Sequence, residues 1–199
     1  MIRPIDLPYR PDSLEPVISE QSMLLHFALY ERYIQRVNTA APGLHSAQEA
    51  VVAAKDAHDL AMLHNAQQIL NHEFAFLSMK PAFSNAPPSG SVGSLIAEQW
   101  GDPAEFWSDW LRASTGMFGS GYVWLVMYLD EIPFGQLRIV ALPNSDGPTG
   151  GVLPLMAMDV WEHAWYIDHP LMRDRYAAGW LDMLADWERV NARLHAGVS

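Results

Sequence analysis

Residues 159–166 read Asp-Val-Trp-Glu-His-Ala-Trp-Tyr, and this stretch decides how the rest of the chain is interpreted. It places a carboxylate, Asp159, and an imidazole, His163, four residues apart among large aromatic side chains. Polar groups in apolar surroundings are costly to bury unless a partner satisfies them. A metal ion would satisfy both, because carboxylate oxygen and imidazole nitrogen are common ligands of first-row metals. Two ligands do not complete a metal site, so further ligands are expected elsewhere in the chain.

Two histidines earlier in the chain are the candidates for the missing ligands. His26 lies in residues 22–30 and His72 in residues 65–76, two apolar stretches with helical character and without Gly or Pro. A single histidine on an apolar helix face is more often a core residue with a hydrogen-bond partner than a ligand. The interpretation of both histidines as ligands therefore depends on the motifs that surround them.

Further short motifs occur along the chain: Leu7-Pro8-Tyr9, residues 14–19, Asn65-Ala66 with Asn71-His72, residues 118–125 and residues 187–191. Together with residues 159–166, they resemble the motifs of the iron/manganese superoxide dismutase family, and the resemblance covers nearly the whole chain. The stretch 159–166 is the most specific of them, while the others are weak alone but occur in the right order and spacing.

The resemblance implies both the fold and the reaction. It implies an α+β fold, with an N-terminal long α-hairpin followed by a C-terminal domain of helices around a small three-stranded antiparallel sheet. We place the two domains at residues 1–82 and 83–199. It also implies a superoxide dismutase, which converts superoxide to dioxygen and hydrogen peroxide by redox cycling of one metal ion per subunit. The ligands implied are His26, His72, Asp159 and His163.

The choice of metal depends on residues around the ligands. Ligand type alone permits zinc, iron or manganese, but dismutation needs a metal with two accessible oxidation states, which excludes zinc from this reaction. Gln68 lies one helical turn before His72, on the same face. Iron-type members of the family carry a glutamine at this spot, whereas the manganese types bring it from a loop that reads Asn-Ser-Asp-Gly here, at residues 144–147. We therefore expect iron, with manganese as the alternative.

The hydrophobic pattern predicts the elements that the resemblance implies. We expect two long helices within residues 19–76, a turn at residues 39–43 and a break near His58. A linker is expected at residues 81–91, helices at 92–100 and 103–117, and a closing helix at 172–194. Residues 122–128, 136–141 and 153–158 are rich in β-branched and aromatic residues and predict three strands.

The composition limits the partners and the location. The chain has 199 residues, 50% of them hydrophobic, and its formal net charge is −11. Such a charge argues against nucleic-acid binding and repels superoxide at long range, so a local positive field at the site has to attract the substrate. No apolar run reaches membrane-spanning length and no secretion signal is present, so we expect a cytoplasmic protein without membrane contact.

The substrate entrance departs from the family pattern. The family carries a gateway tyrosine eight residues after the first ligand, where this chain has Ile34. At about 100° per residue, Tyr33 lies about 20° from His26 around a helix and Ile34 about 80°. We therefore expect Tyr33, or failing it Tyr30, to supply the gateway hydroxyl, although an equally good interpretation is that both tyrosines only pack between helices.

The aromatic surroundings of the metal are partly changed. Trp161 matches a tryptophan that lies beside the metal in the family, while Phe76 and Tyr122 replace two further tryptophans of the family.

The resemblance also implies a homodimer. Glu162 corresponds to a glutamate that reaches the histidine ligand of a second subunit, and Tyr166 to a tyrosine that bonds across the interface. The usual partner of that tyrosine is a histidine. It is missing here, because the corresponding position is near the one that Tyr30 holds. The altered entrance motivates a second interpretation, a diverged metal-binding member of the fold with weak or no activity. A metal-free helical interaction protein would leave four polar groups unexplained.

Overall fold

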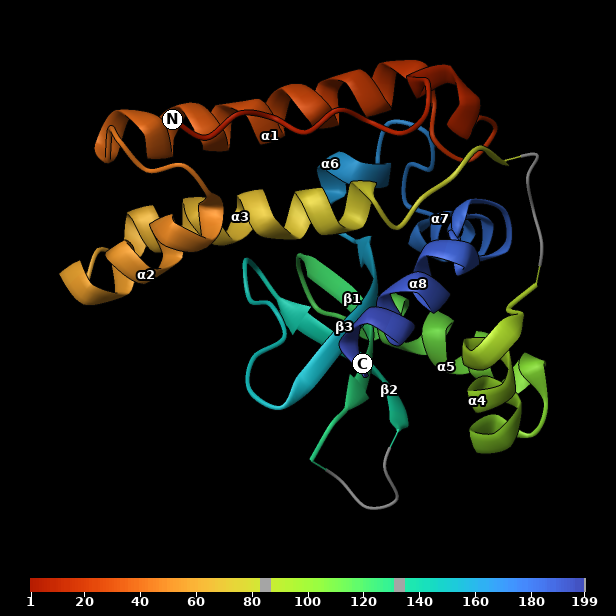
Figure 1. Cartoon of the computed structure of the whole chain (residues 1–199). Coiled ribbons are helices and arrows are strands. Elements are labelled where there is room, and N and C mark those ends of the chain that lie inside the picture. Colours follow the sequence, from red (N-terminus) through yellow and green to blue (C-terminus); the bar gives the residue numbers. More distant parts are fainter. Residues whose placement is uncertain (83–86, 131–134, 199) are drawn as a thin grey trace.

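The computed structural model describes residues 1–82, 87–130 and 135–198, and its N-terminal half is the predicted helical hairpin. Its first arm is α1 (Glu20–Ala40), and its second arm consists of α2 (Ala47–Ala57) and α3 (Leu60–Phe76). A short 3-10 turn, η1 (Pro11–Leu14), precedes them. The long helices α1 and α3 lie side by side across the top of Figure 1, with α2 at the far end of α3. The hairpin begins where Ser19 caps α1 by accepting a hydrogen bond from the amide of Ser22.

The second arm breaks near His58, as the sequence predicts. His58 has a φ of 55°, in the left-handed region that ends a helix. The next residue, Asp59, starts α3 because its side chain accepts a hydrogen bond from the amide of Met62. α3 therefore takes its own direction and places the face that carries Gln68 and His72 against α1 and the sheet.

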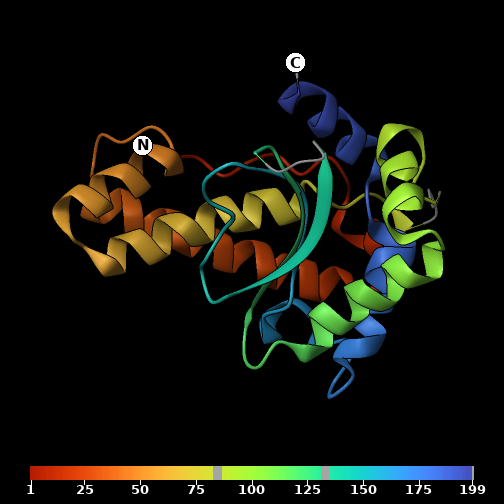
Figure 2. The ribbon, with the colours of Figure 1, turned by 90° about the horizontal axis from the view of Figure 1, so that it is seen from below.

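The C-terminal half contains helices around one antiparallel sheet, so the predicted α+β fold class is confirmed. The helices α4 (Gly90–Trp100) and α5 (Pro103–Gly116) come first. The strands β1 (Gly121–Tyr128), β2 (Gln136–Pro143) and β3 (Val152–Asp159) follow in the spatial order β2-β1-β3. Figure 2 shows the hairpin on one side of the sheet and the later helices on the other. Residues 83–86 of the predicted linker lie outside the described residues.

The central strand β1 is buried on both faces, which explains its continuous apolar sequence. Val123, Leu125 and Met127 belong to the main core, while Tyr122, Trp124 and Val126 point to the opposite face. On that face they pack in one cluster with Phe74 and Ala75 of α3. In the sheet register Tyr122 lies directly opposite Asp159, so the two side chains share the face that meets the hairpin.

The helical character predicted at residues 172–194 is confirmed, but the stretch is not one continuous helix. The structure divides it into α7 (Arg173–Gly179), a short π-helix η3 (Trp180–Leu184) and α8 (Trp187–Gly197). The break has a physical cause, because Ala185 forms an antiparallel bridge with Met79, and the amide of Asp186 donates to the carbonyl of Ser78. These bonds attach the C-terminal segment to the chain that leaves the hairpin.

One further short helix, α6 (Glu162–Trp165), lies between β3 and α7. None of the described helices combines the length and apolarity needed to cross a bilayer.

Arg193 joins the two halves next to this bridge. Its guanidinium donates to the carbonyl of Leu77 at the end of the hairpin, to the hydroxyl of Ser78 and to the carbonyl of Leu155 in β3. It also lies 3.7 Å from the ring centre of Phe74. Burial lowers the pKa of Arg193 to about 10, which leaves it charged at neutral pH.

We predict that Arg193→Met lowers the free energy of unfolding by about 2–4 kcal/mol, because buried acceptors lose a charged donor. Arg112→Met is the control, since Arg112 is 72% exposed and, among the residues that the structure describes, forms its ion pair with Asp109. Such surface pairs contribute about 0–1 kcal/mol. Urea unfolding followed by circular dichroism measures both. Equal unfolding midpoints for the two variants would contradict the joining role of Arg193.

Candidate metal centre

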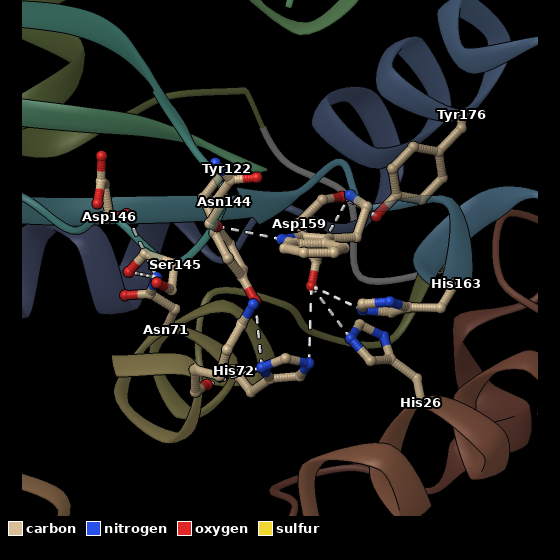
Figure 3. A network of polar contacts seen from close by, with 12 residues as sticks. His26, Asn71, His72, Tyr122, Asn144, Ser145, Asp146, Asp159, His163 and Tyr176 are labelled. Atoms are coloured by element: carbon tan, nitrogen blue, oxygen red, sulfur yellow. Dashed lines mark hydrogen bonds and ion pairs between the residues drawn. The ribbon is translucent and has the colours of Figure 1, made fainter. Parts of the chain in front are cut away.

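Four side chains from four separate elements converge between the hairpin and the sheet (Figure 3). They are His26 of α1, His72 of α3, Asp159 at the end of β3 and His163 of α6, and one ligand atom from each lies within 4.8 Å of the others. The Oδ2 atom of Asp159 is 3.2 Å from Nε2 of His26, 3.9 Å from Nε2 of His72 and 3.4 Å from Nε2 of His163. The sequence analysis therefore named four residues that the structure brings together.

The local backbone at Asp159 aims its carboxylate at the three rings. The Oδ1 atom accepts a hydrogen bond of 2.7 Å from the amide of Trp161, which turns the chain as it leaves β3. The other oxygen, Oδ2, is left to face the imidazoles. The hydroxyl of Tyr176 donates to the backbone carbonyl of Asp159 at 3.0 Å and fixes the end of the strand. The same turn starts α6, so His163 follows one helical turn after the carboxylate.

The hydrogen-bond partner of Nδ1 determines the tautomer of His72. Nδ1 lies 2.7 Å from the backbone carbonyl of Gln68, and a carbonyl only accepts hydrogen bonds. Nδ1 therefore carries the proton, and Nε2 presents a lone pair toward Asp159. An imidazole held in this way by a backbone carbonyl is the usual arrangement of a metal-binding histidine.

Burial and the shared carboxylate set the charges at the centre. Burial lowers the pKa of His26, and it lowers the pKa of His72 to about 3, so both rings stay neutral at physiological pH. Burial acts to raise the pKa of Asp159, but the close approach of His163 and His26 outweighs burial and holds that pKa far below its usual range. The site therefore combines an ionised carboxylate with the neutral imidazoles of His26 and His72.

These groups fit a metal ion. Within the described chain, the buried Nε2 atoms of His72 and His163 have no hydrogen-bond partner. Unsatisfied buried nitrogens facing a carboxylate are unfavourable unless a cation lies between them. Three nitrogens and one oxygen form a donor set that suits a first-row metal and leaves room for a further ligand.

Aromatic rings surround the ligands and keep the centre apolar. The ring of Phe76 lies 4.9 Å from that of His26, and Trp161 stacks at 5.6 Å on His163. The hydroxyl of Tyr122 donates to Oε1 of Gln68 at 2.6 Å. Burial raises the pKa of Tyr122 well above its ordinary value, so this hydroxyl stays protonated.

A cavity of about 430 Å³ lies beside the centre, and three of the predicted residues line it: Tyr33, Gln68 and Trp161. Tyr33 also touches the ligand His72, with ring centres 5.4 Å apart. Arg36 and His64 lie on the wall of the same cavity. A larger cavity of about 490 Å³ lies between α2, α3 and the sheet, and neither cavity is lined by the four ligands themselves. The smaller cavity is the one lined by Tyr33 and Trp161, whose rings contact His72 and His163, so it is placed to admit a substrate.

The other entrance candidates lie elsewhere. Tyr30 is fully buried, and its hydroxyl donates to Glu73 at 2.8 Å while accepting from the amide of Ile5 at 3.1 Å. It does not line the cavity beside the centre. Ile34 belongs to the core.

Comparison with known proteins agrees with this geometry. The family model for iron/manganese superoxide dismutases, alpha-hairpin domain, matches residues 4–80, and the model for their C-terminal domain matches residues 88–193. The chain belongs to the iron/manganese superoxide dismutase family.

Similar proteins match this member of the family over nearly its whole length. It is 36% identical to the superoxide dismutase [Fe] of Bacteroides fragilis over 193 residues, which cover 94% of the chain and 96% of the relative. It is 35% identical to the superoxide dismutase [Fe] of Synechocystis sp. over 198 residues, 96% of both proteins. The superoxide dismutase [Fe] of Pseudoalteromonas translucida is 34% identical over 189 residues, 94% of the chain and 95% of the relative.

Two contributors to the centre were not predicted from the sequence. Tyr122 was assigned only to the aromatic surroundings, yet its hydroxyl contacts both Gln68 and His72. The carbonyl of Asn144, whose φ of 53° is left-handed, accepts a hydrogen bond from the indole of Trp161 at 3.2 Å. The first could have been inferred from the need of any buried hydroxyl for a partner, whereas a backbone carbonyl leaves no signal in the sequence.

Proposed function

We propose that the protein is a superoxide dismutase that holds one iron ion between His26, His72, Asp159 and His163. The convergence of neutral imidazoles and an ionised carboxylate, with two buried nitrogens lacking any partner in the described chain, carries this proposal. Membership of the family and the names of the three similar proteins support iron, as does Gln68 on the wall of the cavity. Manganese is the alternative metal.

The bound metal supplies the one-electron exchange, in which two superoxide ions and two protons give dioxygen and hydrogen peroxide. The side chains of the protein supply the rest. His26 and His72 stay neutral as ligands because burial lowers their pKa values, and Asp159 supplies the negative charge that retains a cation. Gln68 and Tyr33 present polar groups to the cavity, where they can bind a small anion and help to deliver protons. The aromatic rings limit access of bulk water.

Tyr33 is our proposed gateway residue. It lies between the cavity and His72, which is where a gating hydroxyl is needed. The alternative, Tyr30, has its hydroxyl engaged by Glu73 and by the amide of Ile5. Arg36 lies 5.8 Å from the ring of Tyr33 and adds a positive charge beside it, which favours an anionic substrate in a chain of net charge −11.

We also propose that the protein forms a homodimer through the surface around α6. Glu162 is exposed and its carboxylate forms no ion pair within the described residues, while His163 is 24% exposed at the same surface. Large apolar side chains are exposed near it, a pattern typical of interfaces. They are Leu24, Leu25, Phe118, Tyr166, Ile167 and Leu171.

Two contacts bring that apolar surface together. α6 packs against α1, which carries the leucines. Arg173 donates to the carbonyls of Met117 and Gly119, on either side of Phe118. Glu162 of each copy would then approach His163 of the other, as the resemblance implies.

We also propose that the chain divides into two domains between residues 82 and 83. The cytoplasmic location stays a prediction that cell fractionation would test.

The first prediction concerns metal and activity. Protein reconstituted separately with iron and with manganese should bind about one ion per chain, with dismutation per bound ion at least tenfold higher for iron, because an outer group such as Gln68 tunes the metal that it faces. Metal analysis and a superoxide-consumption assay measure this. His26→Gln should lose most of the metal, whereas the exposed His45→Gln should not. Full occupancy without activity for either metal would favour the diverged metal-binding protein.

The second prediction concerns the gateway. Tyr33→Phe should lower turnover per bound metal by about tenfold, because a positioned proton donor is lost. Tyr30→Phe should instead lower the free energy of unfolding by about 1–2 kcal/mol, because two partly buried hydrogen bonds are lost. Steady-state kinetics and urea unfolding separate the two effects. Unchanged turnover and unchanged peroxide sensitivity of Tyr33→Phe would show that Tyr33 is not the gateway.

The third prediction concerns the interface. Glu162→Ala should raise the dimer dissociation constant by at least tenfold and lower metal occupancy, because a carboxylate that fixes a ligand ring is lost. Glu188→Ala, at an exposed position on α8, is the control. Sedimentation velocity with metal analysis is the measurement. A dimer with normal occupancy in Glu162→Ala would remove the bridging role.

A further inference from the structure

The larger cavity, of about 490 Å³, takes no part in the proposed reaction but has the size of a small-molecule site, for which roughly 300–1,000 Å³ is typical. None of the residues that line it also lines the smaller cavity beside the metal centre. Leu70, Phe74 and Leu77 of α3 give it an apolar wall, which Trp124 of β1 and Pro154 of β3 continue on the sheet. The cavity can therefore hold the apolar part of a small molecule.

The same cavity contains a cation without a carboxylate partner. Arg193 of α8 lines it and donates to the carbonyls of Leu77 and Leu155 and to the hydroxyl of Ser78, all of which are neutral. Within the described chain these bonds use three of the five N–H groups of the guanidinium, and no carboxylate forms an ion pair with it. A largely buried charge with neutral partners favours an anion beside it.

The other charged residues of the wall leave this field positive. Lys55 of α2 is exposed, and it forms no ion pair among the residues that the structure describes. Glu73 is the acidic residue of the wall, and its carboxylate accepts a hydrogen bond of 2.8 Å from the hydroxyl of Tyr30 on α1. Two cations and one acid thus line the cavity, although the formal net charge of the chain is −11. Such a wall selects an anion over a cation.

We propose that this cavity binds a small amphipathic carboxylate, with its apolar body against Phe74 and Trp124 and its carboxylate beside Arg193 and Lys55. A planar guanidinium suits a carboxylate because its N–H groups match the two oxygens. An apolar wall with a few charged groups is also the usual composition of a small-molecule site. The inference does not depend on the proposed reaction, since no ligand of the metal centre lines this cavity.

The chemistry of the ligand is tested with 2-naphthoate and 2-naphthamide, which share one ring system and differ in charge. Isothermal titration calorimetry of the iron-loaded protein at low salt measures the binding of both. We expect 2-naphthoate to bind saturably, at one per chain, with a dissociation constant at least tenfold lower than that of 2-naphthamide. Equal dissociation constants, or no saturable binding of 2-naphthoate at millimolar concentration, would overturn the proposal.

The place of binding is tested with Lys55→Glu, and Arg32→Glu is the control. Both residues are exposed on helices, but Arg32 does not line the cavity. Lys55→Glu should raise the dissociation constant of 2-naphthoate at least threefold and leave that of 2-naphthamide unchanged, because it reverses one charge of the wall. Arg32→Glu should change neither. An effect of Arg32→Glu alone would overturn the proposal, since a carboxylate held at the metal centre would not respond to Lys55.

A second copy of the chain is the competing occupant of this cavity. Sedimentation velocity of the wild-type protein and of Lys55→Glu, without added ligand, separates the two possibilities. The proposal expects the same association state for both proteins, because the cavity holds a small molecule. A change of association state in Lys55→Glu would show that the cavity is part of a contact between copies, and it would overturn the small-molecule site.

Discussion

The structure depends on one electrostatic constraint, the burial of four electron-pair donors that face one another. His26 contacts the carboxylate of Asp159 at 3.2 Å, but the Nε2 atoms of His72 and His163 have no hydrogen-bond partner in the described chain. A cation resolves this, and the surrounding elements are arranged to keep the donors in place. The amide of Trp161 holds one oxygen of Asp159, and a backbone carbonyl holds the outer nitrogen of His72. Asp159 and His72 are thus each oriented by a backbone group.

One residue beside the ligands, Gln68, has two roles. Gln68 contributes its backbone carbonyl to a ligand ring and its side chain to the cavity, so one helical residue serves both sides of the centre. Tyr122 reaches this residue from the sheet because the register places it beside Asp159. The hairpin and the sheet therefore meet through polar side chains as well as through the apolar cluster that contains Phe74 and Trp124.

The sequence predicted the four ligands and the order of the elements because both follow from local patterns. The break at His58 and the three strands were recognisable from turn residues and from β-branched runs. The division of the last helix was not, because it depends on a bridge between Ala185 and Met79, residues far apart in the chain. The role of Tyr122 was missed for a related reason: a tyrosine in an apolar strand shows that a partner is needed, but not which one. Helix geometry indicated Tyr33, and its position on the cavity wall agrees with that prediction.

The distribution of the ligands along the chain has a consequence for synthesis. His26 and His72 belong to the hairpin, whereas Asp159 and His163 come from the end of β3 and from α6, late in the sequence. A ribosome therefore completes the hairpin and two of the three strands while the nascent chain holds only two of the four ligands, too few to retain a metal firmly. Capture of the ion has to wait until β3 and α6 have emerged. A chain truncated before residue 159 would lack two of the four ligands.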